Sequence, residues 1–114
     1  MKKSPVLTPA RVRALHRSFE VCKQQIATLD WLTEGSVTEN HPGTWRWTRK
    51  VKAKTVTVAL SIAQAAAFRK AIQNHRRLEK LIRKMRAISQ NVLLNTLPNP
   101  ARRISGKHPK SGLS

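Results

Sequence analysis

The sequence is poor in the residues on which most catalytic and metal-binding sites depend. It has one cysteine, five acidic residues and no tyrosine among 114 residues, and its four histidines are scattered along the chain. A single thiol excludes an internal disulfide. Because Cys22 falls on an apolar stripe, we interpret it as a buried, unreactive thiol in a reducing cytoplasm. These residues suggest neither a zinc site nor a Cys–His nucleophile.

Three further absences narrow the function. No two of the five acids are spaced as an evident acid–base pair. No glycine-rich phosphate loop is present, since the four glycines are isolated. No apolar run is long enough to cross a bilayer, and no apolar run follows the basic first residues as a secretory signal requires. We therefore expect a cytoplasmic, non-catalytic protein with no cofactor, no metal and no membrane partner.

Positive charge is what the sequence has in excess. Lys and Arg number 23 against 5 Asp and Glu, a formal net charge of +18. The excess is +3 in residues 1–34, +4 in 35–61, +7 in 62–97 and +4 in 98–114. So strong a positive field opposes compaction unless a polyanion neutralises it. Nucleic acid is the first candidate partner, and an anionic membrane surface is the second.

Residues 61–97 predict one long helix. Ser61 can cap it, with Gln64 completing a capping box, and no proline or glycine interrupts it before Pro98. A heptad stripe along it consists of Ala71, Leu78, Leu81, Met85, Ile88 and Val92. Basic residues recur on the opposite side: Arg69, Lys70, Arg76, Arg77, Lys80, Arg83 and Lys84. Residues seven apart lie about 10 Å from one another on one side of a helix, so this row can meet successive phosphates.

A second heptad stripe comes earlier in the chain. Thr8 followed by Pro9 is typical of a helix start. The apolar residues then follow steps of three and four: Val12, Leu15, Phe19, Cys22, Ile26 and Leu29. We expect this helix to end at residues 30–32, with a turn over residues 33–36. Because the chain between the stripes is short, the two helices should pair antiparallel.

The segment between the helices predicts a two-stranded β-hairpin over residues 44–51 and 55–60, which both alternate. A two-residue loop at Lys52-Ala53 would place Trp45 and Trp47 on one face together with the strand valines. Lys-Ala is unfavourable in a turn that needs positive φ, so a wider loop stays open. We favour the two indoles as anchors on the Ala-rich start of the long helix over platforms that stack on bases.

These elements predict an α+β fold: two long helices in an antiparallel, coiled-coil-like hairpin, with a two-stranded β-hairpin between them. The domain spans residues 8–97, after a mobile lead-in of residues 1–7 and before a basic, disordered tail of residues 98–114. Two such helices bury little surface. We therefore expect either a homodimer or docking of the tryptophan face onto the long helix.

Several stretches carry a family resemblance. They are Gly-Ser-Val-Thr-Glu at 35–39, Trp-Arg-Trp-Thr-Arg-Lys-Val at 45–51 and Lys-Thr-Val-Thr-Val at 54–58, followed by a similar helix pattern at 68–82. Over about residues 20 to 92 the chain resembles a family of small bacterial proteins of unknown function, often encoded in or beside transposase genes.

The chain departs from that family at two points. Many members have a Cys-rich insertion where this chain has only residues 40–43, so any metal-binding role of the insertion is not carried over. The Asn-Gly typical of the hairpin loop is Lys52-Ala53 here. The resemblance implies a mobile-element setting but no established activity.

From charge and resemblance we expect a nucleic-acid-binding accessory protein of a mobile element, which contacts phosphates through the helix and the tail. The expected binding residues are Arg46, Lys50, Lys52, Lys54, Arg69, Lys70, Arg76, Arg77, Lys80, Arg83, Lys84, Arg102, Arg103, Lys107 and Lys110. Two alternatives stay open. One is a coiled-coil interaction module that forms a homodimer or binds a transposase, and the other is an RNA-binding component of a ribonucleoprotein particle. The choice between DNA and RNA is open too.

Overall fold

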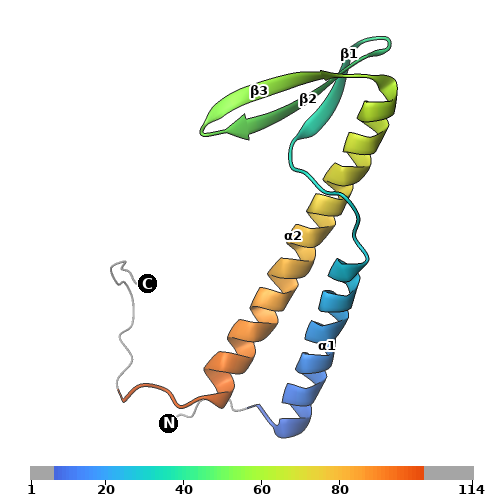
Figure 1. Ribbon diagram of the computed structural model, residues 1–114. Helices are drawn as coiled ribbons and strands as arrows, with labels where there is room; N and C mark the ends of the chain where they lie inside the picture. Colours follow the sequence, from blue (N-terminus) through green and yellow to red (C-terminus); the bar gives the residue numbers. More distant parts are fainter. Residues whose placement is uncertain (1–6, 102–114) are drawn as a thin grey trace.

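The computed structural model describes residues 7–101, as two antiparallel helices and a three-stranded sheet (Figure 1). The elements in chain order are α1 (Pro9–Ala27), β1 (Ser36–His41), β2 (Thr44–Val51), β3 (Lys54–Leu60) and α2 (Ile62–Thr96). The molecule is elongated and flat, with extents of 65 × 35 × 16 Å. Most of the predicted lead-in and tail lies outside the described residues.

The prediction of a two-stranded hairpin is wrong, because β1 adds a third strand at the edge of the sheet. The strand order is β1-β2-β3 with antiparallel neighbours, and Val37 lies opposite Trp47. Within β1 only Val37 is half-buried, and the other five residues are exposed. The segment therefore lacks the alternation from which a strand is predicted. Pairing with β2 makes it a strand.

Gly35 allows the start of β1 to lie directly against β2. Its φ is +110°, and a Cβ there would lie 2.6 Å from both the Thr48 carbonyl oxygen and Trp47 Nε1. The same indole N–H donates a hydrogen bond to the Glu34 carbonyl oxygen at 2.9 Å. Any side chain at Gly35 would collide with β2, so the residue that looked like a lone turn glycine determines where the edge strand begins.

The register of β2 and β3 follows the expected pattern. Val51 pairs with Lys54, Trp47 with Val58 and Trp45 with Leu60, so the loop is the two-residue Lys52-Ala53. Both loop residues have positive φ, 50° and 67°, as the mirror-image turn of a tight hairpin requires. The two-residue loop is confirmed although neither residue favours that conformation.

The inner face of the sheet packs on the first turns of α2. The capping box predicted at Ser61 and Gln64 is present in both directions, at 3.0 and 3.1 Å. Just beyond it, the fully buried Ala65 leaves room for the sheet, and the Phe68 ring lies 4.7 Å from that of Trp47. Small side chains at the start of the helix thus allow β2, which carries both indoles, to lie against it.

The helix α1 begins at the expected Thr8 cap but ends earlier than predicted. The expected end at residues 30–32 is wrong, because α1 stops at Ala27. The Thr28 hydroxyl donates to the Gln25 carbonyl oxygen at 2.7 Å, which satisfies an end-of-helix acceptor. The chain then runs alongside α2, where the Trp31 carbonyl oxygen accepts a hydrogen bond from Asn74 at 2.8 Å.

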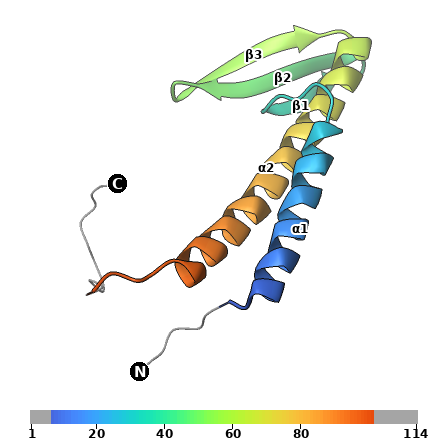
Figure 2. The ribbon, with the colours of Figure 1, turned by 60° about the horizontal axis from the view of Figure 1, so that its bottom comes forward.

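The antiparallel pairing of α1 and α2 is confirmed by contacts at both ends. The Leu7 N–H donates to the Asn95 carbonyl oxygen at 3.4 Å, and Arg77 Nη2 donates to Gln25 Oε1 at 3.3 Å. Cys22 is buried between the helices at 2% exposure and is a free thiol. The sheet projects from α2 on the side away from α1 in both views (Figure 2).

The hairpin loop generates the first prediction. Replacing Ala53 by Gly should stabilise the fold by about 0.5–1 kcal/mol. The change removes about 1–2 kcal/mol of left-handed strain and costs roughly half of that in unfolded-state entropy. Urea unfolding followed by circular dichroism measures the difference.

The matched control for this prediction is Ala59→Gly in the exposed, regular part of β3. It should destabilise by about 0.5–1 kcal/mol, because glycine in a strand loses entropy without relieving strain. If both variants lose stability to the same extent, the tight loop with positive φ is not the structure in solution.

Candidate nucleic-acid interface

Seven of the eight basic residues of α2 lie in exposed rows along the helix. We call this surface the cationic face. It consists of the rows Arg69–Arg76–Arg83 and Lys70–Arg77–Lys84, with Lys80 between them, and all seven residues are exposed. Residues seven apart stay on one side of a helix, about 10 Å from each other. The continuous helix from Ile62 to Thr96 keeps the members of each row on one side of α2. That these residues bind nucleic acid stays a prediction.

Charge of one sign dominates this face. The segment 62–97 holds eight basic residues and one acid, Glu79. Glu79 Oε2 lies 3.3 Å from His75 Nε2, one turn back along α2. His75 is half-buried, whereas the Glu79 side chain is 60% exposed. Glu79 lies about one helical turn from both Arg76 and Arg83, so the seven bases of the cationic face have this one acid beside them.

Two residues of the cationic face have partners within the fold. The Arg69 guanidinium lies 4.4 Å from the centre of the Trp45 ring, where the sheet meets α2. Arg77 bridges the helix pair through its bond to Gln25. Stacking on an indole leaves the N–H edge of a guanidinium able to donate. Both residues therefore combine a structural contact with an exposed positive charge.

A shallow pocket of about 190 Å³ marks the corner between β1 and the cationic face. Arg69, Gln73 and Arg76 line it from α2, and Ser36 and Val37 line it from β1. Two guanidinium groups beside an amide and a hydroxyl give several N–H donors in one place. This corner is suited to a phosphate group.

The basic residues of the sheet form a separate surface. Arg46 and Lys50 lie on the outer face of β2, on either side of Thr48, whose hydroxyl is 3.4 Å from that of Thr57. Lys52 lies in the loop, and Lys54 begins β3. The sheet bases and the helix bases therefore do not form one patch, because the inner face of the sheet is the one that meets α2. Arg102, Arg103, Lys107 and Lys110 lie outside the described residues.

Arg49 is the site residue that the sequence did not single out. Its guanidinium lies 4.1 Å from the centre of the Trp47 ring, and its Nη1 is buried without a hydrogen-bond partner among the described residues. A pocket of about 450 Å³ adjoins it, lined also by Thr48, Lys50 and Thr55. The alternation of β2 already places Arg49 on the same face as Trp47, and that was the available signal.

Neither strand indole is free to act as a stacking platform. Trp47 lies against Phe68 and Arg49 and donates its N–H to the Glu34 carbonyl oxygen. Trp45 lies under Arg69. Both are half-buried toward α2, whereas Trp31 is 84% exposed. Trp45 and Trp47 therefore anchor the sheet on α2, and each also stacks with an arginine guanidinium.

The described residues offer little for other chemistry. No three His, Cys, Asp or Glu side chains in residues 7–101 come together in a way that could hold a metal ion. Within the same residues, neither helix has the length and hydropathy needed to cross a membrane.

Comparison with models of protein families, with curated proteins and with solved structures found no match to the chain. The family resemblance stays a prediction.

Fluorescence quenching tests the placement of the indoles. In a Trp31→Phe variant, emission comes only from Trp45 and Trp47. We expect acrylamide to quench the native variant about twofold less than the urea-unfolded variant, because both indoles are half-buried. Acrylamide is neutral, so the charge of the protein does not bias the result. Equal quenching in the two states would mean that both rings are free in the native protein.

Proposed function

We propose that the chain is a non-catalytic nucleic-acid-binding protein that contacts phosphates through the cationic face of α2. The observation that carries this proposal is the excess of positive charge along one helix. Seven exposed basic residues line α2 in two heptad rows with Lys80 between them, and the one acid of the helix is Glu79. A solvated helix face would carry both signs interleaved.

The mechanism is electrostatic. Each Lys or Arg that reaches a phosphate releases condensed counterions, and this release supplies affinity without reading the bases. The rows of the cationic face repeat about every 10 Å, so one helix can contact several phosphates. The stacked Arg69 and the corner pocket beside it add a contact of defined geometry. The basic residues of the tail extend the same field.

The biological setting of the proposal rests on resemblance. The stretches at residues 35–39 and 45–51 resemble proteins encoded beside transposase genes. We therefore propose an accessory factor of a mobile element in the bacterial cytoplasm. An RNA-binding component of a ribonucleoprotein particle is the variant of this function in which the phosphates belong to RNA.

A salt titration of binding tests the function. Binding of the full chain to duplex DNA, single-stranded DNA and a structured RNA is measured by fluorescence anisotropy across a range of NaCl concentrations. The test variant replaces Arg76, Lys80 and Arg83 by Gln; these three are exposed, and none stacks on an indole or bridges to α1. The slope of log K against log salt should flatten by about 2–3 on duplex DNA, because each phosphate contact contributes about 0.9.

The matched control removes the same charge from the other helix, by replacing Arg11, Arg13 and Arg17 of α1 by Gln. Its slope should change by less than one unit. Both sets are repeated with Arg102, Arg103, Lys107 and Lys110 replaced by Gln, so that the tail does not hide the effect. Equal slopes for the two triple variants in that background would show that the cationic face is merely solvated.

A further inference from the structure

An apolar groove lies between α1 and α2 at the end of the helix pair remote from the sheet. Val12 and Phe19 line it from α1, and Ile88, Val92 and Leu93 line it from α2, around a volume of about 250 Å³. The one hydroxyl in its wall, that of Ser89, already donates to the Met85 carbonyl oxygen at 2.8 Å. The groove therefore exposes a mainly apolar surface to solvent.

None of residues 7–101 covers this groove. The sheet lies at the other end of the molecule and on the far side of α2 (Figures 1 and 2). The radius of gyration is 21.0 Å, whereas a compact chain of this length has one of about 13 Å. Among the described residues the buried apolar side chains are few: Cys22, Leu60, Ala65, Ala71, Ile72 and Leu81. The apolar side chains between the two helices therefore lack packing partners on one side.

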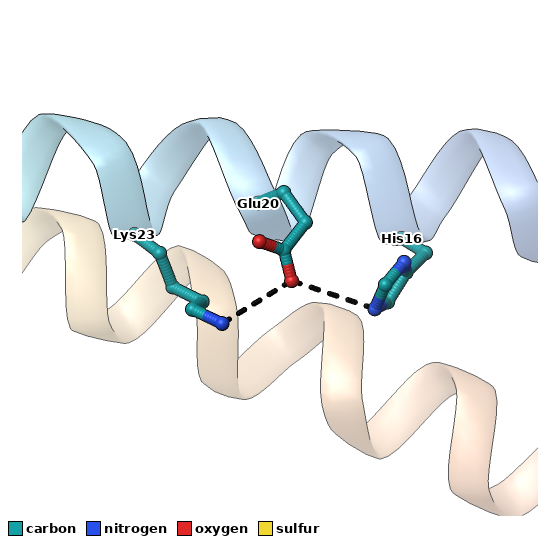
Figure 3. A network of polar contacts seen from close by, with 3 residues as sticks. All are labelled: His16, Glu20 and Lys23. Atoms are coloured by element: carbon teal, nitrogen blue, oxygen red, sulfur yellow. Dashed lines mark hydrogen bonds and ion pairs between the residues drawn. The ribbon is translucent and has the colours of Figure 1, made fainter.

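The groove side of the helix pair differs in charge from the rest of the molecule. On α1, Glu20 Oε2 lies 3.3 Å from Lys23 Nζ and 3.6 Å from His16 Nε2, and His16 lines the groove (Figure 3). On α2, His75 pairs with Glu79. His75 is 18 residues, five helical turns, from Leu93 and so lies on the same side. Through their contacts with His16 and His75, Glu20 and Glu79 therefore border this side.

We infer that a second copy of the chain docks on this groove side and completes a four-helix core. Two helices offer a strip about 28 Å long at 1.5 Å per residue, and neighbouring axes in bundles are about 8–10 Å apart. A second helix pair of the same dimensions covers such a strip. The groove residues of each copy then bury those of the other.

Charge favours a copy of this chain as the occupant. Each copy carries +18, so two copies can meet only where the local charge is close to zero. The groove side comes closest to that condition, because Glu20 and Glu79 offset two of its three bases, Arg13, Lys23 and Arg86, which leaves 3 − 2 = +1. Acids and bases on one face also allow a self-complementary two-fold contact. In this dimer the cationic faces of both copies lie on the outer surface.

Adjacent leucines provide a matched test. Leu93 lines the groove at 56% exposure, whereas Leu94 does not line it and is 58% exposed on another side of α2. By light scattering on the full chain, without nucleic acid, we expect a mass of about 26 kDa, twice that of the 12.9 kDa chain. Leu93→Glu should weaken dimerisation about tenfold or more, because a buried leucine contact is lost. Leu94→Glu should leave it unchanged.

Circular dichroism of both variants should match that of the parent chain, since both leucines are exposed in the single copy. Raising the salt should increase the dimer fraction, because screening weakens the repulsion between two cationic copies. Phosphate binding has the opposite salt dependence, so this inference and the proposed function fail independently. A mass of 12.9 kDa for the parent chain at high salt and high micromolar concentration would overturn the inference. Equal dissociation of the two leucine variants would overturn it too.

Discussion

Docking of the sheet on the first turns of α2 is the contact on which the rest of the architecture depends. Trp47 lies between Phe68 of α2 and Arg49 of its own strand. The small, buried Ala65 in the first turns of α2 leaves room for the sheet. This contact occupies one side of the helix, and α1 occupies another. The basic rows lie on the surface of α2 that these two contacts leave exposed, and Arg69 and Arg77 at its edges touch the sheet and α1. The packing therefore limits the surface of α2 that could meet a polyanion.

Charge separates the two proposed surfaces. Glu20 borders the groove through His16, and Glu79 pairs with His75, whereas the cationic face carries seven bases. We expect a like-charged copy to be repelled least at the groove and a polyanion to be attracted most strongly to the cationic face. Dimerisation would bring two cationic faces into one particle. Two linked sites on one polyanion give an avidity greater than either site alone.

Much of this fold can be predicted from local sequence rules. The caps at Thr8 and Ser61, the heptad stripes and the antiparallel helix pairing follow from residue types and their spacing. The hairpin register follows from strict alternation, which works even with an unfavourable Lys52-Ala53 loop. The cationic face follows as well, because a seven-residue repeat on a continuous helix has only one geometric outcome.

Other features were decided by tertiary contacts. The polar segment Ser36–His41 is a strand only because β2 offers an unpaired edge and Gly35 fits against the Trp47 indole. After α1 ends at Ala27, the chain lies along α2, where Asn74 donates to the Trp31 carbonyl oxygen. The helices, the hairpin register and the sign of the charge follow from residues near one another along the chain, so local sequence is enough to predict them. The edge strand, the stacking of Arg69 on Trp45 and the open groove depend on residues far apart in sequence, so they become visible only when the chain is folded.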